Sequence, residues 1–103
     1  MTALTTTVLT NRQKEDLKSN WQVTEIEHLD DKLLELWNKN YLTLAEIQDN
    51  IIEPLFNLLK TRKYSIVIVE DFNLVKVFQL VQIAKYLGIE CLFPTQTNFI
   101  SYY

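Results

Sequence analysis

The spacing of apolar and polar residues at the start of the chain predicts a strand, a helix and a second strand. The stretch 3–9 is rich in Thr, Val and Leu, which favours a strand. Thr10 and Gln13 form a capping box, the pattern that opens a helix, here over 11–20. Residues 22–28 alternate loosely between polar and apolar, and this pattern indicates the second strand.

Two helical patterns follow in the middle of the chain. Asp30 and Asp31 open the first, because acidic residues suit the positive end of a helix dipole. Thr43 and Glu46 form a second capping box, after which apolar residues keep helical spacing up to a cluster of basic residues. Pro54 lies inside this second pattern. Because proline has no N–H to donate, we expect it to kink or split the helix.

The clearest strand is the stretch 65–69, which is continuously apolar and β-branched, as is typical of a central parallel strand buried on both faces. Asp71 is a natural N-cap for a helix over 72–87, and Gly88 suits the position that ends it. Another strand follows over 89–93. This unit predicts a right-handed crossover between parallel strands. The fold class expected for the chain is therefore α/β, with a mostly parallel sheet flanked by helices.

Composition and charge limit the classes of function. The chain has 103 residues, a net charge of −3, one Cys and one His. An acidic protein of this kind lacks the basic face that duplex nucleic acids require, and so few Cys and His residues argue against a metal cluster or a disulfide. No apolar run approaches the ~18 residues of a membrane span. We expect a single cytoplasmic domain over residues 1–103, with no metal or other cofactor and no duplex nucleic acid or membrane as partner.

Ligands of parallel sheets bind beyond the carboxyl ends of the strands. That rule selects three polar segments of this chain, namely 5–7 with 10–12, 70–73 and 94–97. Each also has a structural interpretation: the threonines as strand residues, Asp71 as a helix cap, and the last segment as an ordinary turn before a short strand over 98–102. Since Gly88 is the only glycine, glycine-rich phosphate loops are excluded. Helix N-termini, hydroxyls and amides remain as phosphate-binding groups.

The polar positions of the helix over 72–87 recur every three residues, so the polar stripe winds around the helix and leaves no single solvated face. Such a helix is buried on more than one side, either by the chain's own helices or by a second subunit. The apolar residues that we name as candidates for a homodimer interface are Val77, Phe78, Val81 and Tyr86.

The reactive side chains form no catalytic pattern by themselves. His28 is a lone histidine at the end of a predicted strand, and we interpret it as a structural hydrogen-bonding residue rather than a catalytic one. Cys91 lies in a predicted strand and is interpreted as a small buried apolar residue. Composition and pattern alone therefore stop at a small α/β protein with a candidate ligand site at the carboxyl edge of its sheet.

Several short motifs, read together, extend this interpretation. They are Leu9-Thr10-x-x-Gln13, Leu29-x-x-x-Leu33-x-x-Leu36-Trp37, Pro54 with Leu58-Leu59, Asp71-Phe72 after the central strand, and Leu87-Gly88-Ile89 followed by Thr95. In that order they resemble the family of small stand-alone CRISPR-associated proteins found beside type III CRISPR loci. Those proteins are similar to a minimal form of the CARF domain, which binds cyclic oligoadenylate messengers.

The resemblance implies a Rossmann-like homodimer that acts as a ring nuclease. Such a protein binds cyclic tetra-adenylate and cuts it to linear di-adenylate, which switches antiviral signalling off. A ribose 2′-hydroxyl attacks the neighbouring phosphate, without a metal ion. Carried over to this chain, the resemblance names Asp71 and Thr95 as catalytic. The ligand-binding residues that it implies are Thr6, Thr7, Arg12, Gln13, Glu70, Phe72, Asn73, Gln96 and Thr97.

Two departures from the family pattern keep other functions open. Thr6 and Thr7 stand where the family has Ser-His. The family turn Gln-Gly-Asp-Phe-Gly-Ala-Thr is replaced over 69–75, where only Asp71 and Phe72 match and both glycines are absent. The alternatives are a protein that binds the messenger without cutting it, a sponge, and a dimeric protein-interaction module without a nucleotide site.

Overall fold

A five-stranded sheet runs through the computed structural model, which describes residues 1–39, 43–70 and 74–102. The strands are β1 (Thr2–Thr5), β2 (Glu25–His28), β3 (Ile66–Ile68), β4 (Glu90–Pro94) and β5 (Phe99–Ser101). Their order is β2-β1-β3-β4-β5, and only β5 is antiparallel to its neighbour. The predicted mostly parallel sheet is therefore confirmed, with β3 in its centre and buried at every position.

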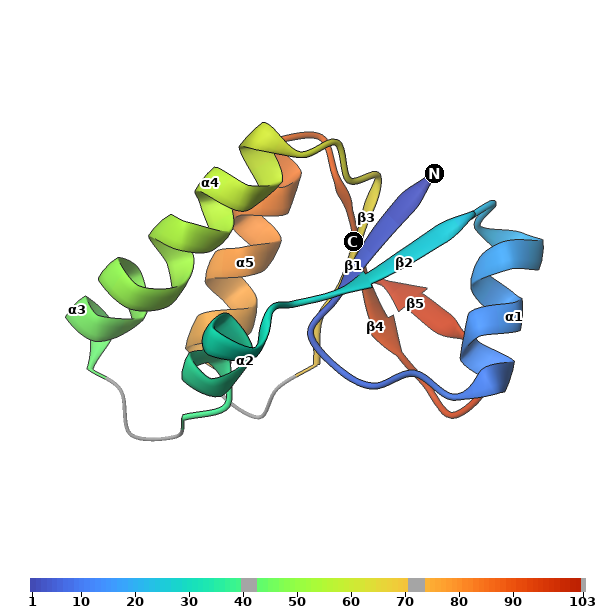
Figure 1. The fold of residues 1–103 in the computed structure, drawn as a ribbon, viewed down its shortest axis with the longest axis horizontal. Helices are drawn as coiled ribbons and strands as arrows, with labels where there is room; N and C mark the ends of the chain where they lie inside the picture. Colours follow the sequence, from blue (N-terminus) through green and yellow to red (C-terminus); the bar gives the residue numbers. More distant parts are fainter. Residues whose placement is uncertain (40–42, 71–73, 103) are drawn as a thin grey trace.

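Helices cover both faces of this sheet (Figure 1). They are α1 (Asn11–Asn20), α2 (Asp31–Trp37), α3 (Leu44–Ile47), the π-helical turn η1 (Gln48–Ile52), α4 (Glu53–Thr61) and α5 (Leu74–Tyr86). α1 lies on one side of the sheet, and the remaining helices lie on the other (Figure 1). The arrangement is that of a small Rossmann-like α/β domain. Among the described helices, none has the length and apolar character needed to cross a membrane.

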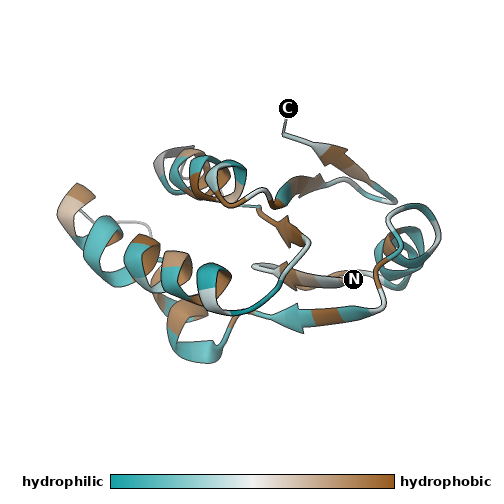
Figure 2. Cartoon of the chain, turned by 90° about the horizontal axis from the view of Figure 1, so that it is seen from above, coloured by the Kyte–Doolittle hydropathy of each residue, from teal (hydrophilic) through white to brown (hydrophobic). Residues whose placement is uncertain are grey.

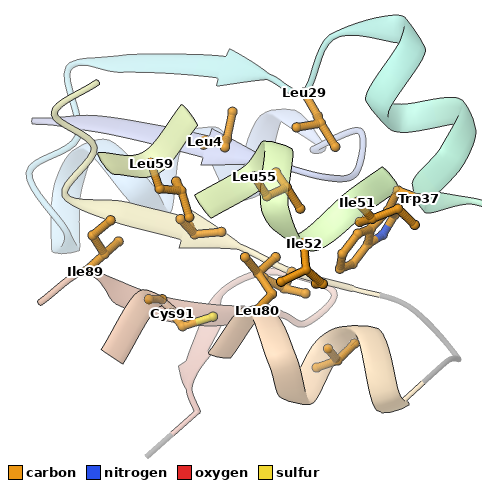
Figure 3. Close-up of a cluster of buried hydrophobic side chains, with 14 of the residues drawn as sticks. Leu4, Leu29, Trp37, Ile51, Ile52, Leu55, Leu59, Leu80, Ile89 and Cys91 are labelled. Carbon is orange, nitrogen blue, oxygen red and sulfur yellow. The ribbon is translucent and has the colours of Figure 1, made fainter. Parts of the chain in front are cut away.

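Alternate strand residues face the two helical layers, as the pleat of a strand requires. Val67 of β3 packs with the core beneath α2, α4 and α5, where Trp37, Leu55 and Leu80 are completely buried (Figure 3). Ile68, its neighbour in the strand, packs with the smaller core under α1. Figure 2 shows the same division, with apolar residues concentrated on the strands and on the helix sides that face them.

Both predicted capping boxes are confirmed. The Thr10 hydroxyl accepts a hydrogen bond from the Gln13 N–H at 3.2 Å, and the Gln13 Oε1 accepts one from the Thr10 N–H at 2.8 Å. Thr43 and Glu46 make the same reciprocal pair at the start of α3. These contacts satisfy N–H groups that a helix leaves free at its first turn.

Pro54 interrupts the α-helical hydrogen-bond pattern, in a form that the sequence did not predict, and the helix continues past it. Just before the proline the helix takes the wider π-helical form of η1. The Glu53 N–H there donates to the Gln48 carbonyl five residues earlier. Pro54 lacks an N–H, and its ring would clash with the carbonyl of Asn50 in a regular helix. A π-turn spaces these groups further apart, so the two α-helices remain joined in one rod.

The end of α5 confirms the role of Gly88. Its φ angle is +72°, in the left-handed region that favours glycine. The N–H of Ile89 donates to the Ala84 carbonyl at 2.8 Å, and the N–H of Gly88 donates to the Lys85 carbonyl at 3.2 Å. This pair of bonds is a Schellman motif, which satisfies the last carbonyls of the helix. The proposed Asp71 cap at the other end lies outside the described residues.

The first two strands are shorter than predicted. β1 ends at Thr5, and β2 begins only at Glu25. Gln22 has a φ angle of +59°, which a strand does not accommodate. The chain after Thr5 is instead held by hydrogen bonds to the end of β3, so it leaves the sheet early. Pro94 is the last residue of β4, paired with Phe99 in the antiparallel edge strand, which confirms the predicted final strand.

Candidate functional site

The carboxyl ends of three neighbouring strands enclose a pocket of ≈ 320 Å³. Thr5 of β1 is paired with His28 of β2 on one side and with Ile68 of β3 on the other, so these strand ends lie side by side. We call this cavity the threonine pocket. Its polar lining residues are Thr5, Thr6, Thr7, His28, Asn38 and Glu70. It occupies the place where parallel sheets bind their ligands.

The threonines divide into two that hold the backbone and one that faces the pocket. The buried Thr6 hydroxyl donates to the Ile68 carbonyl at 3.1 Å and accepts from the Glu70 N–H at 3.4 Å. The Thr5 hydroxyl bridges the backbone of Thr7, donating to its carbonyl at 2.8 Å. No described residue hydrogen-bonds the Thr7 hydroxyl, which leaves it available at the pocket.

His28 is a site residue that the sequence analysis assigned to a structural role. Its side chain is exposed at the pocket, and within residues 1–39, 43–70 and 74–102 its imidazole has no hydrogen-bond partner. The structural hydrogen bond that we expected is therefore not formed there. The rule of carboxyl strand ends applies equally to the strand before His28 and would have selected it. Asn38, the C-cap of α2, carries no such signal, because its approach to the pocket depends on tertiary packing.

Gln13 and Thr95 lie next to each other, but away from the threonine pocket. The Gln13 Nε2 donates to the Thr95 carbonyl at 2.5 Å. The Thr95 hydroxyl accepts from the Asn98 N–H at 3.0 Å, within the turn that joins β4 to β5. Both side chains thus fix the local backbone, and the roles in ligand binding and catalysis that we predicted for them remain predictions.

The other predicted site residues are dispersed. Arg12 and Thr97 line a shallow groove along α1, together with Glu15 and Asp16, whose carboxylates oppose an anionic ligand there. Gln96 is exposed on the turn after β4. Asp71, Phe72 and Asn73 lie outside the described residues. Of the predicted ligand-binding residues within the described part, Thr6, Thr7 and Glu70 are the ones that the structure brings together in the threonine pocket.

Tyr102 lies at the end of β3, where the charge of Glu70 affects its pKa. The Tyr102 hydroxyl donates to the Val69 carbonyl at 3.0 Å. Burial raises the pKa of Tyr102 to about 12, and the neighbouring ionisable groups of Cys91 and Glu70 add to the shift. Glu70 therefore places a negative potential at the strand end that borders the pocket.

The predicted dimer face of α5 is only partly available. Val77 is 7% exposed and belongs to the chain's own core, so its assignment to a subunit interface was wrong. Phe78 and Tyr86 are 65% and 80% exposed. Phe78 borders an apolar groove between α4 and α5 that Phe56 also lines.

Comparison with known proteins gives a family and no described activity. No curated protein and no solved structure matches the chain. A family model matches residues 1–99, nearly the whole of the α/β domain. The chain therefore belongs to the family described as the uncharacterized protein MJ1673 family.

Proposed function

We propose that the protein binds cyclic tetra-adenylate as a homodimer and cleaves it to linear di-adenylate, as a ring nuclease of type III CRISPR defence. The threonine pocket carries this proposal. It combines a hydroxyl without a partner among the described residues, on Thr7, with the exposed imidazole of His28 at the ligand-binding edge of a Rossmann-like sheet. Hydroxyl and imidazole groups suit the phosphate and ribose of a nucleotide, and they need no glycine-rich loop.

The size of the pocket supports the proposal of a dimer. At ≈ 320 Å³ it lies at the low end of the ~300–1,000 Å³ typical of ligand sites. A space of this size admits one nucleotide, whereas a ring of four needs a site shared between two protomers. The exposed Phe78 and Tyr86 provide an apolar surface for such a pairing.

The reaction that we propose requires that the ribose and the phosphate are held in position. It also requires that a proton is taken from the 2′-oxygen and that one is given to the 5′-oxygen. The ribose 2′-oxygen forms a bond to the adjacent phosphorus and loses its proton, the bond from phosphorus to the 5′-oxygen breaks, and that oxygen gains a proton. The products end in a 2′,3′-cyclic phosphate and a 5′-hydroxyl. An imidazole ring can take up a proton and give it back, so His28 is the residue that we assign to proton transfer. Thr7 donates to a phosphate oxygen as charge develops.

A non-catalytic messenger-binding protein is the second candidate, and Glu70 favours it. Its carboxylate borders the pocket and opposes the build-up of negative charge that cleavage requires. The Thr95 hydroxyl, which the resemblance makes catalytic, is already bonded to the backbone of Asn98. Binding without turnover would agree with both observations.

The test is incubation of the purified protein with radiolabelled cyclic tetra-adenylate in EDTA, followed by chromatography and a native gel. Linear di-adenylate establishes the nuclease, and a gel shift with intact ligand establishes the sponge. Thr7→Val is expected to weaken binding at least tenfold, while the matched change Thr61→Val, at the exposed end of α4, leaves it unaltered. If the unmodified protein gives neither product nor shift, the proposal fails and a protein-interaction module becomes the better account.

The dimer is tested separately by light scattering. Phe78→Asp is expected to give a monomer that no longer binds the ring, because a buried carboxylate opposes association of the two apolar surfaces. Ile100→Asp changes another exposed apolar residue, on β5 and outside the threonine pocket, and serves as the control. An unmodified protein that is monomeric at all concentrations would contradict the shared site.

A further inference from the structure

A lysine is buried between α5 and the end of α2. Lys76 lies in the first turn of α5 and is 0% exposed. Its Nζ donates a hydrogen bond to the backbone carbonyl of Trp37, the last residue of α2, and lies 5.0 Å from the centre of the Trp37 ring. A lysine is almost never fully buried unless its charge is compensated by such contacts.

The carbonyl that Lys76 binds belongs to one wall of the threonine pocket. Leu34 and Asn38 of this wall line the pocket. They are joined by a hydrogen bond from the Asn38 N–H to the Leu34 carbonyl at 3.0 Å, and Trp37 lies within the turn that this bond closes. Trp37 is itself completely buried, beside Ile51 of η1 (Figure 3).

The position of the cation matches the electrostatics of the helix end. The carbonyls at the C-terminus of a helix carry a partial negative charge, which a nearby ammonium group stabilises. α2 has no basic residue in its own last turn, and Lys76 of α5 places its ammonium group on the Trp37 carbonyl at this end. The contact therefore joins two elements that are distant in the sequence, and it does so directly behind the pocket wall.

We propose that Lys76 is the positioning residue of the threonine pocket. Its ammonium group fixes the Trp37–Asn38 end of α2, and this sets the width of the pocket between that wall and the threonines after β1. Lys76 itself does not touch the ligand. The effect that we expect on ligand affinity rests on the proposed function, whereas the effect that we expect on the order of the wall does not.

Hydrogen exchange of the wall tests the inference without any ligand. The amides of Asn38 and Lys39 donate to the carbonyls of Leu34 and Leu36 at 3.0 and 3.2 Å, so their exchange reports the order of this helix end. Lys76→Met fits the buried space and removes the ammonium group. We expect the exchange of both amides to become at least tenfold faster, with little change after Lys85→Met, an exposed lysine of the same helix. Exchange within twofold of the unmodified protein would overturn the inference.

If Lys76→Met does not fold, the unmodified protein decides the question by native-state exchange in denaturant. The amides of Asn38 and Lys39 are then expected to open with the same free energy as that of Leu80, in the middle of α5, because the buried contact makes wall and helix one unit. Faster, independent opening of the two wall amides would contradict the proposal.

The affinity for cyclic tetra-adenylate is the second measurement. In a folded Lys76→Met protein we expect a dissociation constant at least tenfold higher, with Lys85→Met unchanged. Equal affinity in a variant whose wall amides have lost protection would overturn the role of Lys76 in the pocket. Absence of binding by the unmodified protein would instead refute the proposed function, and hydrogen exchange alone would then decide the role of Lys76.

Discussion

The side-chain amide of Gln13 donates to the backbone carbonyl of Thr95, which joins the first turn of α1 to the turn between β4 and β5. The other atom of the same amide, Oε1, accepts from the N–H of Thr10. One buried side chain thus caps a helix and holds an edge hairpin of the sheet. Its two polar atoms serve the fold before any ligand arrives.

Replacing Gln13 is therefore expected to lower stability. Gln13→Ala removes both contacts and should reduce the free energy of unfolding by about 1–3 kcal/mol, since a cap and a buried hydrogen bond are lost together. Gln13→Glu keeps the acceptor for Thr10 and removes the donor to Thr95. The decrease in the free energy of unfolding of this variant therefore measures the contact with the hairpin alone. Urea unfolding followed by circular dichroism measures both. Stability equal to that of the unmodified protein in both variants would contradict the structural role.

His28→Gln is expected to separate cleavage from binding. Glutamine keeps a polar group at the end of β2 but cannot transfer a proton, and general acid–base catalysis contributes about 10²–10⁴-fold to rate. Single-turnover cleavage of labelled cyclic tetra-adenylate should slow by about that factor, while the dissociation constant changes little. Glu27→Gln, the preceding residue of β2, is the control outside the threonine pocket. Unchanged cleavage by His28→Gln would exclude His28 as the proton carrier.

Gly88→Ala tests the left-handed turn after α5. A Cβ at this position meets no atom within 4 Å, so the cost comes from the backbone conformation alone. We expect a loss of about 1–2 kcal/mol in the free energy of unfolding, as for other L-residues forced into this region. Gly88→Asn should cost less, because asparagine adopts the left-handed conformation more readily. Thermal unfolding of the two variants gives the comparison, and an equal loss in both would argue against this explanation.

The two local predictions that held share one physical cause. The capping boxes and the Gly88 turn depend on residues within a few positions of each other, so the sequence contains all of the determinants. Pro54 shows the limit of predictions from neighbouring residues. Its position in the helix predicted an interruption, but the π-turn depends on keeping Ile51 and Leu55 in the core on either side of the proline, which is a tertiary requirement.

The site was predictable to the extent that strand topology determines it. Thr6, Thr7 and Glu70 meet because parallel strands end at one edge, and the sequence identified that edge. Arg12 and Gln13 follow the same strand but are carried away by α1, whose placement depends on packing of Leu17 against the sheet. Lys76 shows no sign in the sequence of being buried, because its partner belongs to another helix.

Stability is expected to fall at alkaline pH. The pKa of Tyr102 is raised from 10.0 to about 12 and that of Cys91 from 9.0 to about 12, in each case chiefly by burial. A pKa that is higher in the folded state contributes stability that is complete below the unfolded value and is lost as the pH rises through the folded one. The free energy of unfolding should therefore be flat to about pH 9 and decline towards pH 12.

Tyr102→Phe provides the control for this pH dependence. The variant lacks the ionisable hydroxyl and should show a shallower decline above pH 10, together with a loss of about 1 kcal/mol at neutral pH from the missing bond to Val69. Urea unfolding between pH 7 and 11.5 gives the profile, and absorbance at 295 nm follows ionisation of the tyrosines. An alkaline slope identical to that of the unmodified protein would show that Tyr102 does not contribute.

The position of β1 between β2 and β3 also constrains how the protein folds during its synthesis. Of the five strands, β1 leaves the ribosome before the others and β2 follows soon after, but β3 is made only after α4 is complete. Until β3 has been made, one side of β1 has no partner strand, and the apolar residues of β1 have no neighbour from the second half of the chain. Pairings between such distant segments slow folding relative to a helical protein of equal length. The growing chain therefore passes through a period in which an incomplete sheet is exposed to cellular chaperones.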